Sequence, residues 1–300
     1  MPCRRSLVIL GACAVAAVGC ERRTTPRATE SAVAVTPAAR ASTAASPLTL
    51  WNHEAGPALL VAAEAPTQAI VVGPDSAGDA SALPGIPRPA SATLIGRGGT
   101  VQVADVQPPT SGNACEPWTV SSAPPPRPWS VGFIGGVVAP VAMDSVETSA
   151  PGDSAKLVAD IVRLASALPN DKAGRFTGLP FEVRAAYRFA LPNGRQVVVA
   201  TLIRQINQEA SPLEERTLLV AERNPSAADT SYSMAYDEQS RGPEDTVEST
   251  DVIGAVLIGS SQRPTIVVNR DFGNATAFGF IERVDAGRWA ARWSSARRSC

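Results

Sequence analysis

Residues 181–207 read Phe-Glu-Val-Arg-Ala-Ala-Tyr-Arg-Phe-Ala-Leu-Pro-Asn-Gly-Arg-Gln-Val-Val-Val-Ala-Thr-Leu-Ile-Arg-Gln-Ile-Asn, and this stretch decides the fold. From Phe181 to Leu191, apolar side chains alternate with charged ones, which is the period of a half-buried β-strand. Residues 195–207 predict a second strand that is fairly apolar on both faces. Asn193-Gly194 between two such runs is a strong hairpin signal. The stretch therefore predicts two antiparallel strands joined by a turn.

Toward the C-terminus the sequence continues with strand-like segments separated by turns. The segments that predict further strands are 216–222, 231–236, 265–269, 275–284 and 288–294. Residues 251–259 fit either a strand or a short helix, because periodicity alone does not separate the two. Trp289 and Trp293 fall four residues apart in the last strand, and alternation predicts that they share one face.

Toward the N-terminus the clearest helix covers about residues 154–168. Its apolar residues recur at three- and four-residue steps, and Asp153 is the expected N-cap. Before it, residues 49–142 predict a β-rich part, with strands at 59–64, 68–72, 92–95, 100–106 and 129–138. The expected fold class is α+β, mainly antiparallel β, with a β-rich N-terminal part and a C-terminal antiparallel sheet that packs one helix.

The first twenty residues have the features of an export signal. Arg4 and Arg5 precede a run of apolar or small residues from Ser6 to Gly19, which has the length of a signal-peptide core and is too short for a membrane span. The end of this run, Ala17-Val18-Gly19-Cys20, resembles the lipobox of bacterial lipoproteins. The resemblance covers the leader only, and Ala17 stands where the family more often has leucine. It implies cleavage before Cys20 and lipidation of that cysteine.

The leader leads to a division of the whole chain. The expected parts are a signal peptide at 1–19, a lipid-anchored tether at 20–48, the β-rich part at 49–142, a connector at 143–153 and an α+β domain at 154–300. The tether is rich in Arg, Thr, Ala, Pro and Ser and has almost no bulky apolar side chains, so it is expected to stay unfolded. Cys115 and Cys300 are the cysteines left after processing and lipidation, and in an exported protein they are expected to form a disulfide.

Composition argues against several kinds of function. The 27 basic and 28 acidic residues give a formal net charge of −1, so no nucleic-acid partner is expected. The only histidine is His53, close to the tether, and no phosphate loop, dinucleotide fingerprint or paired-cysteine metal motif is present. We therefore expect no cofactor and assign no catalytic residue.

Two groups of side chains remain as candidate sites. Acidic residues crowd the segment 237–251, which is interpreted as a solvated loop; those considered as metal ligands are Asp237, Glu238, Glu244 and Asp245. Aromatic residues in the strands are expected in the core, and those considered for ligand binding are Tyr232, Tyr236, Trp289 and Trp293.

The sequence thus predicts an exported, membrane-anchored protein of the bacterial cell envelope. Its expected partners are the membrane, through the lipid on Cys20, and an envelope protein or a glycan. The expected function is a non-enzymatic interaction or scaffold module. Two alternatives stay open, a glycan or small-ligand binding module that uses the aromatic strand faces and a hydrolase that uses carboxylates of the segment 237–251.

Overall fold

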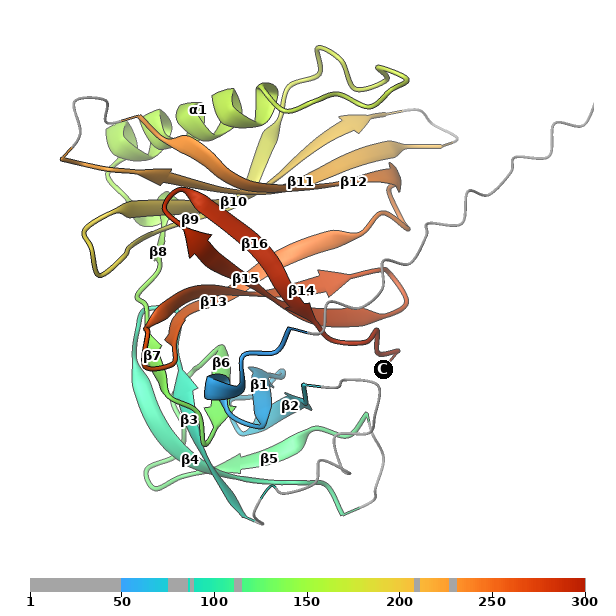
Figure 1. Cartoon of the computed structure of the whole chain (residues 1–300). Coiled ribbons are helices and arrows are strands. Elements are labelled where there is room, and N and C mark those ends of the chain that lie inside the picture. The colour runs from blue at the N-terminus through green and yellow to red at the C-terminus, as the bar shows by residue number, and fades with distance from the viewer. Residues whose placement is uncertain are drawn as a thin grey trace, which may run out of the picture. The chain divides into compact units, whose positions relative to one another are not determined.

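The computed structural model describes residues 50–74, 86, 89–110, 115–207, 211–226 and 231–299. Within these ranges the chain is mostly β, all strand pairs are antiparallel, and there is one α-helix (Figure 1). The strands form a closed six-stranded barrel and two five-stranded sheets. The predicted signal peptide, Cys20 and the tether lie outside the described residues, and so does Cys300.

The barrel occupies the first part of the chain. Its strands follow the spatial order β1-β2-β5-β4-β3-β6 and are β1 (Ala58–Ala62), β2 (Gln68–Val72), β3 (Ala90–Ile95), β4 (Val101–Gln107), β5 (Trp118–Ser121) and β6 (Val131–Ile134). A short 3₁₀ turn, His53–Ala55, precedes β1. Alternate residues of these strands fill the barrel interior, among them Leu60, Leu94 and Trp118.

The two sheets come next and are named here by their neighbours. The helix-side sheet has the order β12-β11-β10-β9-β8, with β8 (Asp144–Ser145), β9 (Glu182–Ala190), β10 (Gln196–Ile206), β11 (Leu213–Arg223) and β12 (Ser233–Pro243). The barrel-side sheet has the order β16-β15-β14-β13-β7, with β7 (Val138–Pro140), β13 (Ser249–Ile258), β14 (Arg263–Asp271), β15 (Thr276–Asp285) and β16 (Arg288–Ser294).

Three hydrophobic clusters hold these elements together as layers (Figure 1). The first lies between the two sheets and makes them a sandwich, with Val199, Leu218 and Ile266 in its centre. The second covers the other face of the helix-side sheet, where α1 (Pro151–Ser166) packs its apolar stripe on Ala200 and Leu219. The third joins the barrel-side sheet to the barrel through the side chains Trp51, Phe133, Phe280 and Trp293.

The predicted hairpin of residues 181–207 is formed by β9 and β10. The Gly194 N–H donates to the Leu191 carbonyl at 2.9 Å, and the Leu191 N–H donates to the Arg195 carbonyl at 2.8 Å. Pro192 fits the second position of this turn because its ring fixes φ. Gly194 has φ of +80°, a conformation that glycine adopts without a steric penalty. Turn chemistry and alternation therefore agree, and the strand prediction here is confirmed.

Two boundaries differ from the sequence prediction. The helix begins at Pro151, with Ala150 as its N-cap, so Asp153 lies in the first turn and is not the cap. Proline is favoured at the first helical position because its missing N–H would have no partner there. The segment 129–138 is not one strand, because Gly135 has φ of +64° and a Cβ on Gly136 would lie 2.2 Å from the Ala55 carbonyl oxygen. The chain bends there and passes from β6 in the barrel to β7 in the barrel-side sheet.

The prediction that Trp289 and Trp293 share one face is wrong. Phe280 pairs with Trp293 but Ile281 pairs with Ala291, so Arg292 is an extra residue in β16. Such a bulge shifts the alternation by one position. Trp289 consequently lies in the core between the two sheets, and Trp293 lies on the opposite face against the barrel.

Candidate functional site

The interior of the sandwich changes from apolar to polar at one level of the helix-side sheet. Val199, Val220 and Tyr236 are paired across β10, β11 and β12 and belong to the core. The inward-facing positions further along the same strands form the rows Thr201–Leu218–Glu238, Ile203–Arg216–Ser240 and Gln205–Glu214–Gly242. Charged and polar side chains thus occupy positions that alternation assigns to the core.

The barrel-side sheet changes at the same end of the sandwich. Val252 of β13 and Val268 of β14 are paired and belong to the core, whereas the next inward pair is Thr250 and Arg270. The two polar surfaces face each other across a cavity of about 330 Å³. The residues that line it are Arg184, Thr201, Leu202, Ile203, Gln205, Glu214, Arg216, Thr217, Leu218, Glu238, Ser240, Glu244, Glu248, Ser249, Thr250 and Asp251. We call this cavity the polar cleft.

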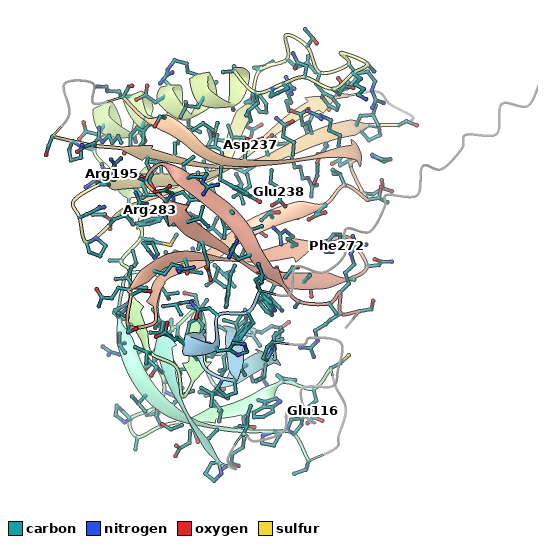
Figure 2. All side chains as sticks on the ribbon, in the orientation of Figure 1. Glu116, Arg195, Asp237, Glu238, Phe272 and Arg283 are labelled. Atoms are coloured by element: carbon teal, nitrogen blue, oxygen red, sulfur yellow. The ribbon has the colours of Figure 1, made fainter. Side chains whose placement is uncertain are left out.

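Glu238 is the centre of the charged network in the polar cleft (Figure 2). Its carboxylate accepts two hydrogen bonds from Arg270, at 3.0 and 2.8 Å, and one from the Tyr236 hydroxyl at 2.6 Å. Burial by itself would raise the pKa of Glu238, but the hydrogen bonds and the charge of Arg270 outweigh burial and hold the pKa below its ordinary value. Glu238 is therefore an ionised group that ties β12 to β14 across the cleft.

Glu248 lies beside this pair and is held much less firmly. Its carboxylate is 3.5 Å from Arg270 Nε, the nitrogen that Glu238 already engages. Burial, and next the repulsion of the Glu238 carboxylate, raise the pKa of Glu248. Two carboxylates that share one guanidinium group thus have pKa values displaced in opposite directions.

A second pair closes the cleft on β11. The Glu214 carboxylate is almost fully buried and accepts a hydrogen bond from Arg216 Nε at 2.7 Å and another from the Gln205 amide. Arg216 also donates to the backbone carbonyls of Val247 and Glu244, in the loop between β12 and β13. This network fixes the loop that carries Glu244 and Glu248 against the sheet.

A different buried carboxylate, Glu222, lies near the other end of the sandwich. Its oxygens accept hydrogen bonds from Arg283 at 2.6 and 3.0 Å and from Trp289 Nε1 at 2.7 Å, and Arg195 lies 3.7 Å away. Arg195 and Arg283 are labelled in Figure 2. Glu222 is 1% exposed and does not line the polar cleft. With all its acceptor capacity used, it serves as a structural link between β11 and β15.

The predicted acidic loop at 237–251 is wrong in its extent. Strand β12 continues to Pro243 and β13 begins at Ser249, so residues 244–248 alone form the loop. Asp237 and Glu238 are neighbours in a strand and point to opposite faces, and Asp245 is exposed. Among the described residues no group of three His, Cys, Asp or Glu side chains is arranged to hold a metal ion. Glu238 and Glu244 do come together, but as part of the polar cleft.

The aromatic candidates lie in the interior. Tyr232, Trp289 and Trp293 are buried, and Tyr236 packs against the core between the sheets. Trp289 donates to Glu222 and Trp293 Nε1 donates to the Pro74 carbonyl at 2.9 Å. Their ring faces are therefore not presented to a ligand.

Cys115 can be placed, whereas its expected partner Cys300 lies outside the described residues. The Cys115 sulfur is 3.8 Å from the carbonyl oxygen of Ser299, the residue before Cys300. The C-terminal segment is fixed there by a reciprocal backbone pair between Arg298 and Thr276, at 2.8 Å in both directions.

The sequence pointed to Glu238, Glu244 and the other carboxylates of 237–251, which include Glu248, but not to Glu214, Arg216 or Arg270. One signal was present. In 214–220, the alternate residues Glu214, Arg216, Leu218 and Val220 change from charged to apolar, and in 236–240 the aromatic Tyr236 is followed by the polar residues Glu238 and Ser240. Register was needed to show that these changes meet at one level, because alternation within a strand does not fix its pairing.

No protein-family model matches this chain, and no curated protein or solved structure matches it either. No helix in the described part of the chain has the length and apolarity that a membrane span needs.

Proposed function

We propose that this protein binds a small ligand in the polar cleft and acts as a non-enzymatic binding module. The observation that carries this proposal is the change from apolar to polar rows around a cavity of about 330 Å³. This volume is within the range of small-molecule sites, which combine apolar walls with a few convergent polar groups. Burying charged groups costs free energy even when they are paired, so apolar side chains there would serve stability better.

We further propose that the module works at the bacterial cell envelope. The leader supports export, and the lipobox-like end at Cys20 supports a lipid anchor. The tether at 20–48 would then hold the folded part away from the membrane surface. An envelope protein or a glycan fragment remains the proposed source of the ligand.

A cavity-filling variant tests the ligand-binding proposal. Ser240 lies on β12 and lines the cleft, so Ser240→Trp is expected to fill it. Small amines, alcohols, acids and sugars would be screened by NMR against the wild-type protein, with the amide signals of Thr201 and Thr250 as reporters. Compounds that move these signals should lose the effect in Ser240→Trp and keep it in the control Ser91→Trp, at an exposed position of the barrel. Absence of any compound that moves them contradicts the proposal.

Anchoring is tested separately. Replacing Cys20 with alanine removes the acceptor for the lipid, so the protein should move from the membrane fraction to the soluble fraction after cell lysis. A conservative control is Cys13→Ala, which changes a cysteine inside the leader and leaves the lipobox-like end intact. Equal membrane retention of all three proteins would remove the lipid anchor from the proposal.

A second candidate function is a hydrolase that uses two carboxylates. The specific observation in its favour is the pair Glu238 and Glu248, whose pKa values are displaced in opposite directions within one cavity. Such a pair can divide the roles of base and acid. Hydrolysis of a panel of glycosides and esters that is lost in both Glu238→Gln and Glu248→Gln would favour this candidate, whereas binding without turnover favours the module.

A further inference from the structure

Charges in the polar cleft do not balance. Five carboxylates line it, from Glu214, Glu238, Glu244, Glu248 and Asp251. Against them stand the guanidinium groups of Arg184 and Arg216 on the lining, of Arg270, which contacts Glu238 and Glu248, and of Arg297, whose charge acts to lower the pKa of Glu248. The cleft therefore carries an excess of negative charge although the chain as a whole is nearly neutral.

The excess is concentrated at Glu248. Arg216 is engaged by Glu214, and Arg270 makes two hydrogen bonds with Glu238, which leaves Glu248 one contact of 3.5 Å with a shared nitrogen. Its side chain is 27% exposed, so solvent screens its charge only in part. The negative charge of Glu248 is incompletely compensated by the protein, and the raised pKa of Glu248 agrees with this. A positive group placed beside Glu248 would compensate that charge.

The other walls restrict the shape of such a ligand. Ile203 and Leu218 face the cavity between the polar rows and offer an apolar surface. Hydroxyl and amide groups from Thr201, Gln205 and Ser240 stand beside them and can make neutral hydrogen bonds. A compact cation with an apolar body matches this combination better than an anion or a bare metal ion does.

We infer that the ligand of the polar cleft is a small organic cation, a primary amine or guanidinium compound with a short apolar body, whose charged group lies at Glu248. This inference rests on the proposed binding function and assigns its ligand class. It predicts that charge, and not only size, decides which compounds enter the cleft.

Three compounds of nearly equal size test the inference. Phenethylamine, 2-phenylethanol and phenylacetate present a cationic, a neutral and an anionic group on the same ring. Titration calorimetry with the full chain in neutral detergent should give the tightest binding for phenethylamine, by about tenfold or more over the alcohol, because a charged hydrogen bond is gained. Phenylacetate should bind most weakly.

Variants test whether the Glu248 carboxylate is the group that binds the cation. Glu248→Gln removes the carboxylate and keeps the shape, and it should weaken phenethylamine binding by about tenfold while leaving 2-phenylethanol unaffected. The matched control Glu64→Gln, at an exposed position after β1, should leave both affinities at the wild-type value. An unchanged thermal midpoint establishes that Glu248→Gln is folded. If the variant does not fold, the order of affinities of the three compounds for the wild-type protein is the test of the cationic ligand class.

The outcomes separate the inference from the function on which it rests. If the alcohol or the anion binds as tightly as the amine, and moves the NMR signals of Thr201 and Thr250, the cleft binds ligands but the cationic class is overturned. If none of the three binds, and the screen against Ser240→Trp is also negative, the binding function itself fails. Loss of amine binding in Glu64→Gln as well as Glu248→Gln overturns the assignment to Glu248.

Discussion

At the scale of single residues, the carboxylates Glu222, which is buried, and Glu248, which is half-buried, are held in two different ways. Glu222 uses its acceptor capacity on Arg283, Trp289 and a backbone N–H, so its charge is compensated by the fold itself. Glu248 has one long contact with a guanidinium group that another carboxylate already holds. A carboxylate of the first kind stabilises the native state, whereas the charge of the second kind can be compensated by a bound ligand.

Replacing Glu222 with glutamine tests the first kind. Burial by itself would raise the pKa of Glu222, but the hydrogen bonds from Arg283 and Trp289 outweigh it and keep the pKa below its ordinary value of 4.5. Removing one partner of a buried pair leaves the other uncompensated, so Glu222→Gln should lower the free energy of unfolding at neutral pH by about 3 kcal/mol. Urea unfolding measures this change.

The role of the ionised Glu222 carboxylate also predicts how stability depends on pH. A carboxylate with a lowered folded-state pKa contributes its stability above the ordinary value of 4.5 and loses it as the pH falls through the folded-state pKa. The difference between wild type and Glu222→Gln should therefore be full at neutral pH and shrink below that value. Glu182→Gln, an exposed glutamate of β9, should leave stability nearly unchanged. A gap that stays constant down to pH 3 would contradict the role of the ionised form.

At the scale of elements, local sequence predicted most of the strands and the hairpins, but not β5 or β8. The segments around residues 59–72, 92–106, 181–207 and 265–294 became strands close to where alternation placed them, because each has its own period and its own turn residues. The loops 97–99 and 192–194 close in the same way, with a β-turn followed by a glycine at positive φ. Where the period and the turn agree, the sequence suffices.

The turn at residues 192–194 gives the prediction at this scale. Gly194 has φ of +80°, and nothing lies within 4 Å of the position that a Cβ would take, so alanine there meets no other group but must adopt a left-handed conformation. Gly194→Ala should lower the free energy of unfolding by about 1 kcal/mol. Gly152→Ala, in the first turn of α1 where space is also open, should leave it unchanged or raise it by up to about 0.5 kcal/mol. Equal effects in chemical unfolding would show that the turn does not require glycine.

Features that depend on which strands pair, and in which register, could not be predicted from the sequence. The bulge at Arg292 reverses the faces of Trp289 and Trp293, and nothing in the local pattern marks an extra residue there. The candidate site has the same origin. Glu214 and Glu238 are visible as polar residues at inward positions, but only the register of β10, β11 and β12 brings them to the same level. The acidic residues of the site were therefore visible in the composition of the sequence, but their arrangement in space was not.

At the scale of the whole molecule, the two ends of the described chain return to the same region. Leu50 N–H donates to the Arg292 carbonyl, and Arg298 donates from its guanidinium to the Val71 carbonyl of β2 at 3.1 Å. The C-terminal segment thus joins β15 of the barrel-side sheet to the barrel. Cys115, after the fourth barrel strand in sequence, approaches the same segment at Ser299.

We propose that a disulfide between Cys115 and Cys300 fastens this region. It would close a loop of about 185 residues, and in the chain-entropy model it would stabilise the native state by about 5 kcal/mol. Cys115→Ser should therefore unfold at markedly lower urea concentration than the wild type, and a reductant should bring the wild type to the level of the variant. Alkylation of the unreduced, denatured protein followed by mass spectrometry identifies the state of both thiols.

Since the bond constrains the unfolded chain, loss of the disulfide should lower stability, while the arrangement of β-strands, followed by circular dichroism, stays the same. Labelling of both cysteines without prior reduction would exclude the bond, and the barrel and the barrel-side sheet would then be joined by their hydrophobic cluster and the hydrogen bonds of Arg298.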